Sequence, residues 1–270
     1  MSWGQLYGVG VGPGAPDLLT VRAVRVLNDV DVIAIPRPNK WSKSLAWRIA
    51  EPNVEKNDEQ EHLFLEFPMT KDKSVLGPAW DKAFAAIGQR LAQGKSVAFI
   101  TQGDPMVYST FIYLFSAANK LWPEVPVKII PGVTSISAVP AAARVPLADG
   151  MERVAVLPAT YGVDDLRQVL NDFDTIVLMK VSSVIQDVVG LLEEEGLLDK
   201  AVYVEKASSS EERVIRDVRQ IRHDKCVYFS MIVVAKKERA GILSDDAESL
   251  QKLEKYWQSG VDEGEGNHAH

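Results

Sequence analysis

The chain has few of the residues from which covalent and metal frameworks are built. Its 270 residues include one cysteine, Cys226, and four scattered histidines (His62, His223, His268 and His270). A single cysteine excludes an internal disulfide and favours a reducing, cytoplasmic setting. Neither the histidines nor Cys226 stand at the spacing of a metal site or beside a partner that would activate a nucleophile. The sequence therefore predicts no metal site.

Long apolar runs and an excess of positive charge are also missing. No segment approaches the length of about 20 apolar residues that spans a bilayer, and the pattern of a first strand follows Met1-Ser2 without a signal-peptide core. The chain has 37 acidic and 30 basic residues and a net charge of −7. Nucleic-acid binding usually requires a basic stripe. We therefore expect neither a membrane nor a nucleic acid as partner.

Strand-length and helix-length segments alternate along the whole chain. Apolar runs predict strands at 5–9, 32–35, 63–67, 97–100 and 127–130, and then at 154–157, 175–179, 201–205 and 227–235. Helical periodicity predicts helices at 18–27, 41–50, 80–91, 163–170, 184–194 and 212–221. This alternation is typical of an α/β fold with crossover connections and a largely parallel sheet.

The proline-bracketed segment Trp122-Pro123-Glu124-Val125-Pro126 divides this pattern in two. We expect an N-terminal α/β domain over residues 1–125 and a C-terminal α/β domain over residues 126–240. Residues 241–270, which become polar and glycine-rich after Gly260, are expected to form a helical or disordered tail.

Three loops stand where predicted strands pass into helices. They are Gly8-Val9-Gly10-Val11-Gly12-Pro13-Gly14, then Gln102-Gly103-Asp104-Pro105, then Pro131-Gly132-Val133-Thr134-Ser135. Open α/β sheets bind ligands at such strand ends, and glycine lets the backbone approach a ligand closely. The alternative is purely structural, with tight turns and with Asp104 as the N-cap of a helix through Phe111 and Leu114.

Three further features have both a structural and a functional interpretation. Gly10-x-Gly12-x-x-Ala15 matches a dinucleotide fingerprint, but the next strand ends Ile35-Pro36-Arg37 without the ribose-binding acid. Lys180 at the end of a strand is either solvated or functional. The basic residues Arg37, Lys40, Lys43 and Arg48, interleaved with Trp41 and Trp47, form either a solvated helix face or a clamp for substrate carboxylates.

Taken together, the loops resemble the signatures of the tetrapyrrole methylases. The opening motif is Leu6-Tyr7-Gly8-Val9-Gly10-Val11-Gly12-Pro13-Gly14-Ala15-Pro16-Asp17-Leu18-Leu19-Thr20, and the others are Gly103-Asp104-Pro105-Met106-Val107-Tyr108-Ser109-Thr110 and Pro131-Gly132-Val133-Thr134-Ser135. The similarity extends from Leu6 to about Ala235. Phe67-Pro68-Met69-Thr70-Lys71-Asp72, Tyr108-Ser109-Thr110-Phe111 and Tyr228-Phe229-Ser230-Met231 resemble the C20-methylating branch that acts on precorrin-2 or cobalt-factor II in cobalamin biosynthesis. Ala15-Pro16-Asp17 and Gln102 depart from the pattern of the uroporphyrinogen methylases.

The resemblance implies two α/β domains of the tetrapyrrole methylase type, with S-adenosylmethionine folded in the cleft between them, in a homodimer. Carried over by motif, the cofactor contacts would be Pro13, Gln102, Gly103, Asp104, Val107, Thr134, Ser135, Met179 and Ala207. Asp104 would orient the donor and could also accept the proton displaced at C20. Lys180 and Tyr228 would orient the tetrapyrrole, and Arg37, Lys40 and Lys43 would bind its peripheral carboxylates.

Other functions stay open at this point. Within the same family the substrate could be uroporphyrinogen, a later precorrin, the diphthamide precursor on a protein, or ribosomal RNA. A protein that binds tetrapyrroles without turnover is an alternative of another class, and an NAD-dependent oxidoreductase is a third. The choice between precorrin-2 and cobalt-factor II also stays open.

Overall fold

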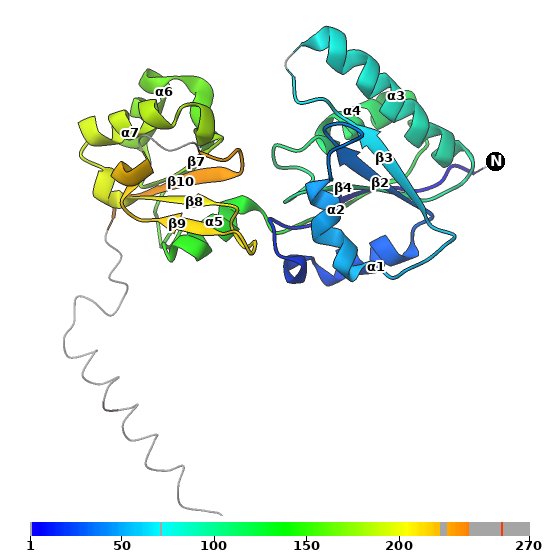
Figure 1. Cartoon of the computed structure of the whole chain (residues 1–270), viewed down its shortest axis with the longest axis horizontal. Helices are drawn as coiled ribbons and strands as arrows, with labels where there is room; N and C mark the ends of the chain where they lie inside the picture. Colours follow the sequence, from blue (N-terminus) through cyan, green and yellow to red (C-terminus); the bar gives the residue numbers. More distant parts are fainter. Residues whose placement is uncertain (1, 71, 222–225, 238–254, 256–270) are drawn as a thin grey trace, which may run out of the picture.

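The computed structural model describes residues 2–70, 72–221, 226–237 and 255. Their strands form two five-stranded sheets, which occupy different parts of the molecule (Figure 1). Within these residues, no helix combines the length and the apolarity that crossing a membrane requires. The expected tail, residues 241–270, lies outside the described residues apart from residue 255.

The first sheet is entirely parallel, with the strand order β3-β2-β4-β1-β5. The strands at its centre are apolar on both faces, as expected where helices cover both sides of a parallel sheet. The bounds are β1 Leu6–Gly10, β2 Val32–Arg37, β3 Glu61–Glu66, β4 Val97–Thr101 and β5 Val127–Ile130.

Helices cover both faces of this sheet. α3 and α4 pack on one face through residues such as Ile87 and Phe111, and α1 and α2 pack on the other through residues such as Leu27 and Ile49. The helices are α1 Val21–Asp29, α2 Leu45–Ala50, α3 Lys73–Ala92 and α4 Phe111–Leu121. α2 begins later than expected, because the hydroxyl of Ser44 caps it by accepting from the backbone N–H of Trp47.

The connections place a topological switch point between β1 and β4, where the crossovers from the two strands run in opposite directions. β1 leads through α1 to β2, which lies beyond β4, whereas β4 leads through α4 to β5, which lies beyond β1. Loops that leave neighbouring strands in opposite directions open a crevice at their carboxyl ends, the usual ligand position in such sheets. The first two glycine loops of the sequence both lie here.

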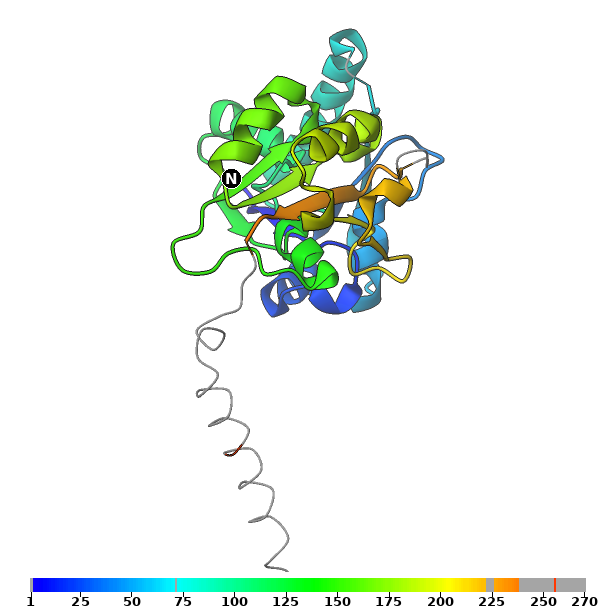
Figure 2. The same cartoon turned by 90° about the vertical axis from the view of Figure 1, so that its left-hand side faces the viewer.

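The second sheet is mixed, with the order β6-β7-β10-β8-β9. β6 and β7 are parallel, and β10 runs antiparallel between β7 and β8. α5 packs on one face, and α6 and α7 pack on the other, as Figure 2 shows. The bounds are β6 Val154–Pro158, β7 Thr175–Met179, β8 Ala201–Glu205, β9 Arg213–Ile215, β10 Ser230–Ala235, α5 Ser135–Ala143, α6 Val163–Asp172 and α7 Ile185–Glu194. Short 3-10 helices cover Pro16–Leu18, Glu51–Asn53, Ala159–Tyr161, Val181–Ser183, Leu198–Lys200 and Val218–Ile221.

One expectation from the sequence is corrected here, and a second is refined as a proposal. The predicted helix at 212–221 is wrong, because β9 pairs antiparallel with β8 and only the turn Val218–Ile221 is helical. The connection 206–212 is too short for a crossover helix, so a hairpin forms and the sheet is not largely parallel. The expected boundary after residue 125 precedes β5, which pairs with β1. We therefore propose that the N-terminal domain ends after Ile130.

Candidate functional site

Three backbone segments meet at the crevice between β1 and β4. Gly12 and Gly103 exchange backbone hydrogen bonds across it. The distance is 3.3 Å from the nitrogen of Gly12 to the oxygen of Gly103 and 2.7 Å from the nitrogen of Gly103 to the oxygen of Gly12. A Cβ atom added to Gly132 would lie 2.1 Å from the carbonyl oxygen of Gly103, and one added to Gly10 would lie 2.5 Å from the same atom. Glycine is therefore required here because the three segments pack against each other, which makes a floor of bare main chain.

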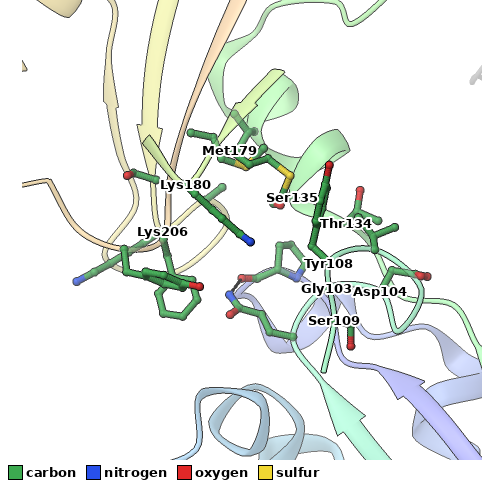
Figure 3. Close-up of a pocket in the computed structure, with 18 of the residues that line it drawn as sticks. Gly103, Asp104, Tyr108, Ser109, Thr134, Ser135, Met179, Lys180 and Lys206 are labelled. Atoms are coloured by element: carbon green, nitrogen blue, oxygen red, sulfur yellow. Dashed lines mark hydrogen bonds between the residues drawn. The ribbon is translucent and has the colours of Figure 1, made fainter. Parts of the chain in front are cut away.

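A cleft of about 290 Å³ lies above this floor and is closed by the second sheet (Figure 3). The floor comes from the loops after β1, β4 and β5, and the opposite wall comes from the loops that follow β7 and β8 and precede β10. Every cofactor contact expected from the sequence lines the cleft, namely Pro13, Gln102, Gly103, Asp104, Val107, Thr134, Ser135, Met179 and Ala207. Lys180 and Tyr228 line it as well.

The carboxylate of Asp104 joins two of the floor segments. One oxygen accepts from the backbone N–H of Met106 at 2.8 Å, and the other accepts from the backbone N–H of Gly132 at 3.0 Å. Asp104 is not a helix N-cap, because α4 begins at Phe111 and Thr110 occupies the cap position. Since both oxygens have backbone partners, the geometry favours a role in holding the loops in place.

The side chain of Gln102 connects the second loop to the first. Its amide Nε2 donates to the carbonyl oxygen of Pro13 at 2.8 Å. The first loop also contacts the second domain, because the backbone N–H of Ala15 donates to the hydroxyl of Ser208 at 3.2 Å. These bonds hold the first loop to the second loop and to the second domain.

The wall contributed by the second domain is cationic and aromatic. The ammonium group of Lys180 lies 5.4 Å from the centre of the Tyr108 ring, which projects from the opposite side of the cleft. A cation over an aromatic face at this distance is attracted by the ring quadrupole. Tyr228 and Phe229 are both exposed, with ring centres 5.1 Å apart. The wall can therefore present both positive charge and ring faces to a ligand.

Unfavourable backbone geometry is concentrated in this cleft. Among the described residues, the non-glycine positions with positive φ are Tyr108, Arg144, Lys180, Lys206 and Ser208. Tyr108, Lys180 and Lys206 all line the cleft. Each such position costs about 1–3 kcal/mol and tends to persist where function requires it. Tyr108, Lys206 and Phe229 were missed as site residues by the sequence analysis, although Tyr108 and Phe229 lie inside quoted motifs.

The basic residues Arg37, Lys40 and Lys43 do not line the cleft. Arg37 pairs with Glu66 at 3.3 Å and lies over the ring of Phe64 at 4.9 Å. Lys40 lies over the exposed ring of Trp41. The register of β2 and β3 places Arg37 directly opposite Glu66, its ion-pair partner.

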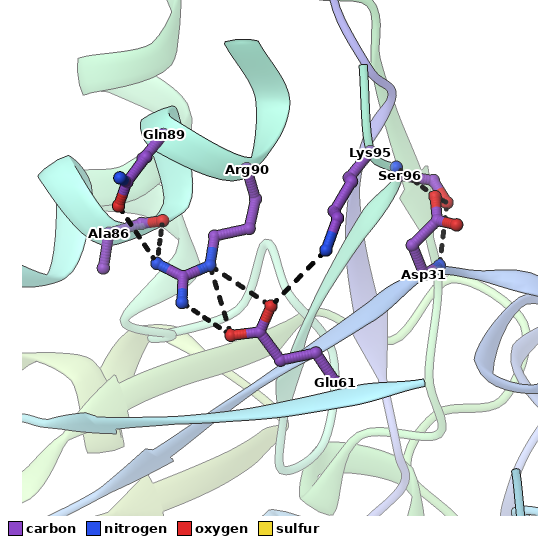
Figure 4. Close-up of polar contacts among 7 residues, drawn as sticks. All are labelled: Asp31, Glu61, Ala86, Gln89, Arg90, Lys95 and Ser96. Atoms are coloured by element: carbon purple, nitrogen blue, oxygen red, sulfur yellow. Dashed lines mark hydrogen bonds and ion pairs between the residues drawn. The ribbon is translucent and has the colours of Figure 1, made fainter. Parts of the chain in front are cut away.

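The amino-terminal edge of the first sheet carries a separate set of polar contacts (Figure 4). Glu61 pairs with Arg90 at 2.6 Å, and this hydrogen bond lowers the pKa of the Glu61 carboxyl. One oxygen of Asp31 accepts from both the hydroxyl and the backbone N–H of Ser96 at 2.7 Å, which lowers the pKa of Asp31. These groups lie at the sheet edge opposite the cleft and join strands, so we interpret them as structural.

No group of three or more metal-ligating side chains occurs in the described part of the chain. The site thus consists of main-chain groups, one fixed carboxylate, two lysines and several aromatic rings.

Comparisons with known proteins agree with this arrangement. The family profile of the tetrapyrrole (corrin/porphyrin) methylases matches residues 5–221. A cobalt-precorrin-2 C(20)-methyltransferase of Salmonella typhimurium is 36% identical over 87% of this chain and 97% of its own length. A precorrin-2 C(20)-methyltransferase of a Sinorhizobium species is 33% identical over 86% of this chain and 95% of its own. The uroporphyrin-III C-methyl transferase of Thermus thermophilus, solved with S-adenyl homocysteine, shares the fold, with a TM-score of 0.62 and 21% identity over 86% of this chain and 98% of its own.

Proposed function

The chain belongs to the tetrapyrrole methylases, and from this premise we propose that it methylates C20 of precorrin-2 or of its cobalt-containing counterpart, cobalt-factor II. The observation that carries the proposal is its similarity to both kinds of C20-methyltransferase over nearly their whole length. The cleft supports it, because the three family motifs and the segment Tyr228-Phe229-Ser230-Met231 converge there from both domains. We place this reaction in cobalamin biosynthesis, in the cytoplasm, and in a homodimer.

We propose S-adenosylmethionine as the methyl donor, and the cleft has features that fit it. A Cβ atom added to Gly103 would meet nothing within 4 Å, so this part of the floor is open to a ligand. The exposed main chain offers N–H and C=O groups to an amino acid and a nucleoside, and the side chains of Thr134 and Ser135 add hydroxyls. When bound, the donor supplies a methyl group that is already activated on a sulfonium ion.

The remaining work of the protein is to position the two reactants. Methyl transfer is an in-line displacement, so fixed placement of donor and acceptor supplies much of the rate. In our proposal Asp104 and Gln102 hold the three floor loops in register under the donor. Proton removal from C20 is not assigned to Asp104, because both of its oxygens already accept backbone hydrogen bonds.

The second domain would orient the tetrapyrrole. Lys180 projects into the cleft and offers its ammonium group to a substrate carboxylate, and Tyr228 offers an exposed ring face and a hydroxyl. Arg37 is the last residue of β2, and Lys40 and Lys43 follow it at the same edge of the first sheet, outside the cleft. We propose them only for carboxylates at the far periphery of the macrocycle.

The test is an anaerobic incubation of the protein with methyl-labelled S-adenosylmethionine and either precorrin-2 or cobalt-factor II. We expect transfer of one methyl group to one of these substrates, together with calorimetric binding of S-adenosylhomocysteine. Transfer to uroporphyrinogen III instead would assign the chain to another branch of the family. Tetrapyrrole binding without transfer to any of the three would contradict an enzymatic function.

A further inference from the structure

Two lysines occupy equivalent positions in the second sheet. Lys180 directly follows β7 and Lys206 directly follows β8. Both strands are antiparallel to β10, which lies between them, so they run in the same direction and end at the same edge. With neighbouring strands about 4.8 Å apart, the two lysines begin roughly 10 Å from each other. Both line the cleft.

Both lysines also have the same unfavourable backbone conformation. Their φ angles are 56° and 48°, in the left-handed region that favours glycine. The backbone N–H of Lys206 donates to the carbonyl oxygen of Phe229 at 2.8 Å, which ties it to the aromatic segment before β10. Glycine would avoid this cost at either position. A lysine at both suggests that the side chains are needed.

The two side chains point in different directions (Figure 3). Lys180 extends into the cleft toward Tyr108, whereas Lys206 turns outward and its ammonium pairs with the carboxylate of Glu211. The side chains of Lys206 and Glu211 are 37% and 58% exposed. An ion pair this open to solvent is weak, so a second carboxylate can replace Glu211 at little cost.

Glu211 also has a second cation within range. Its pKa is lowered mainly by the hydrogen bond from Lys206, and the charge of Arg48 lowers it further. Arg48 lies on α2 in the first domain. Glu211 therefore keeps a positive neighbour if Lys206 leaves it, and that neighbour stands on the opposite domain.

We propose that Lys206 is a second carboxylate-binding residue of this cleft, which exchanges Glu211 for a carboxylate of the tetrapyrrole. Lys180 and Lys206 then hold two carboxylates on one edge of the macrocycle, and Glu211 is released to solvent. This inference rests on the proposed function for its substrate class. It assigns to Glu211 the role of an internal competitor that occupies Lys206 until the substrate arrives.

The test uses Lys206→Met and Glu211→Gln in the full chain, with Lys120→Met as the matched control. Lys120 is exposed in the last turn of α4. Lys206→Met should raise the KM for the tetrapyrrole about tenfold, and Glu211→Gln should lower it about threefold, because a competitor is removed. The kcat and the affinity for S-adenosylhomocysteine should stay within twofold of wild type, and Lys206→Arg should restore most of the affinity.

The two substitutions should change the KM in opposite directions, which a purely structural ion pair would not predict. If both substitutions raise the KM, the pair only stabilises the loop and the proposal is overturned. An unchanged KM in Lys206→Met overturns it equally. Titration with uroporphyrin III, followed by the fluorescence of the porphyrin, measures binding without turnover. The Kd should be lowest for Glu211→Gln, intermediate for wild type and highest for Lys206→Met. If that order of affinities holds but the wild-type protein methylates neither precorrin-2 nor cobalt-factor II, the proposed function fails and the role of Lys206 stands.

Discussion

Replacement of Asp104 by asparagine tests the most specific feature of the site. The substitution keeps the size of the side chain but leaves only one oxygen, so the new amide group points a donor at the backbone N–H of either Met106 or Gly132. A hydrogen bond to a charged group contributes about 1.5–3 kcal/mol. Because this hydrogen bond holds the floor loops together, its loss should disorder the floor and lower the affinity for S-adenosylhomocysteine about 10- to 100-fold.

Calorimetry with S-adenosylhomocysteine and a saturation curve for the methyl donor measure this effect. We expect the Kd and the donor KM to rise together, while kcat at saturating donor stays within about fivefold of wild type. A proton-transfer role for Asp104 would instead lower kcat by about 10²-fold or more even at saturation. Asp58→Asn, in an exposed turn, is the control. An Asp104→Asn variant with unchanged Kd and unchanged turnover would refute the role of Asp104.

Four further variants test other parts of the structure. Gly132→Ala should destabilise the fold by about 3 kcal/mol and abolish S-adenosylhomocysteine binding, because its Cβ would lie 2.1 Å from a carbonyl oxygen. Gly77→Ala in α3 is the control: its Cβ would meet nothing within 4 Å apart from its chain neighbours, and because Pro78 follows it, the free energy of unfolding in denaturant titrations should change by less than about 1 kcal/mol. Lys180→Met should raise the tetrapyrrole KM about tenfold without changing the Kd for S-adenosylhomocysteine; an equal rise in both would contradict its placement on the substrate side. Glu61→Gln should cost about 1 kcal/mol at neutral pH. Arg90 lowers the pKa of the Glu61 carboxyl in the folded state, so the stabilisation is present above the usual carboxyl pKa of 4.5 and is lost as the pH falls through the lower pKa of the folded state. The cost of Glu61→Gln should therefore vanish at such low pH. A cost that persists there in thermal melts would refute the ion pair.

The floor of the cleft was predictable because its determinants are local. Each loop follows a short apolar strand, and glycine or an Asp-Pro pair marks the turn. The sequence did not reveal why Gly10 and Gly132 are glycines, since their neighbour Gly103 is distant in the chain. Close packing between segments becomes visible only when β1, β4 and β5 are side by side.

The second sheet was harder to predict, because its order depends on non-local pairing. β10 inserts between β7 and β8, and the sequence carries no mark of that antiparallel position. The ion-pair partner of Arg37 could not be predicted from the sequence, because it is on another strand. The pairing of β2 with β3 places Glu66 opposite Arg37, and only the register shows this. Lys206 was missed because a lysine at a strand end is usually solvated. Its equivalence to Lys180 is visible only once β7 and β8 are known to lie on either side of β10.

The central claim is that this cleft directs a methyl group from a sulfonium donor to one carbon of a tetrapyrrole. The most direct measurement is ¹³C NMR of the product formed with methyl-¹³C-labelled S-adenosylmethionine. We predict one new methyl resonance, coupled to C20 in a product prepared from substrate labelled at that carbon. A labelled methyl on any other carbon, or no incorporation from either precorrin-2 or cobalt-factor II, would contradict the account.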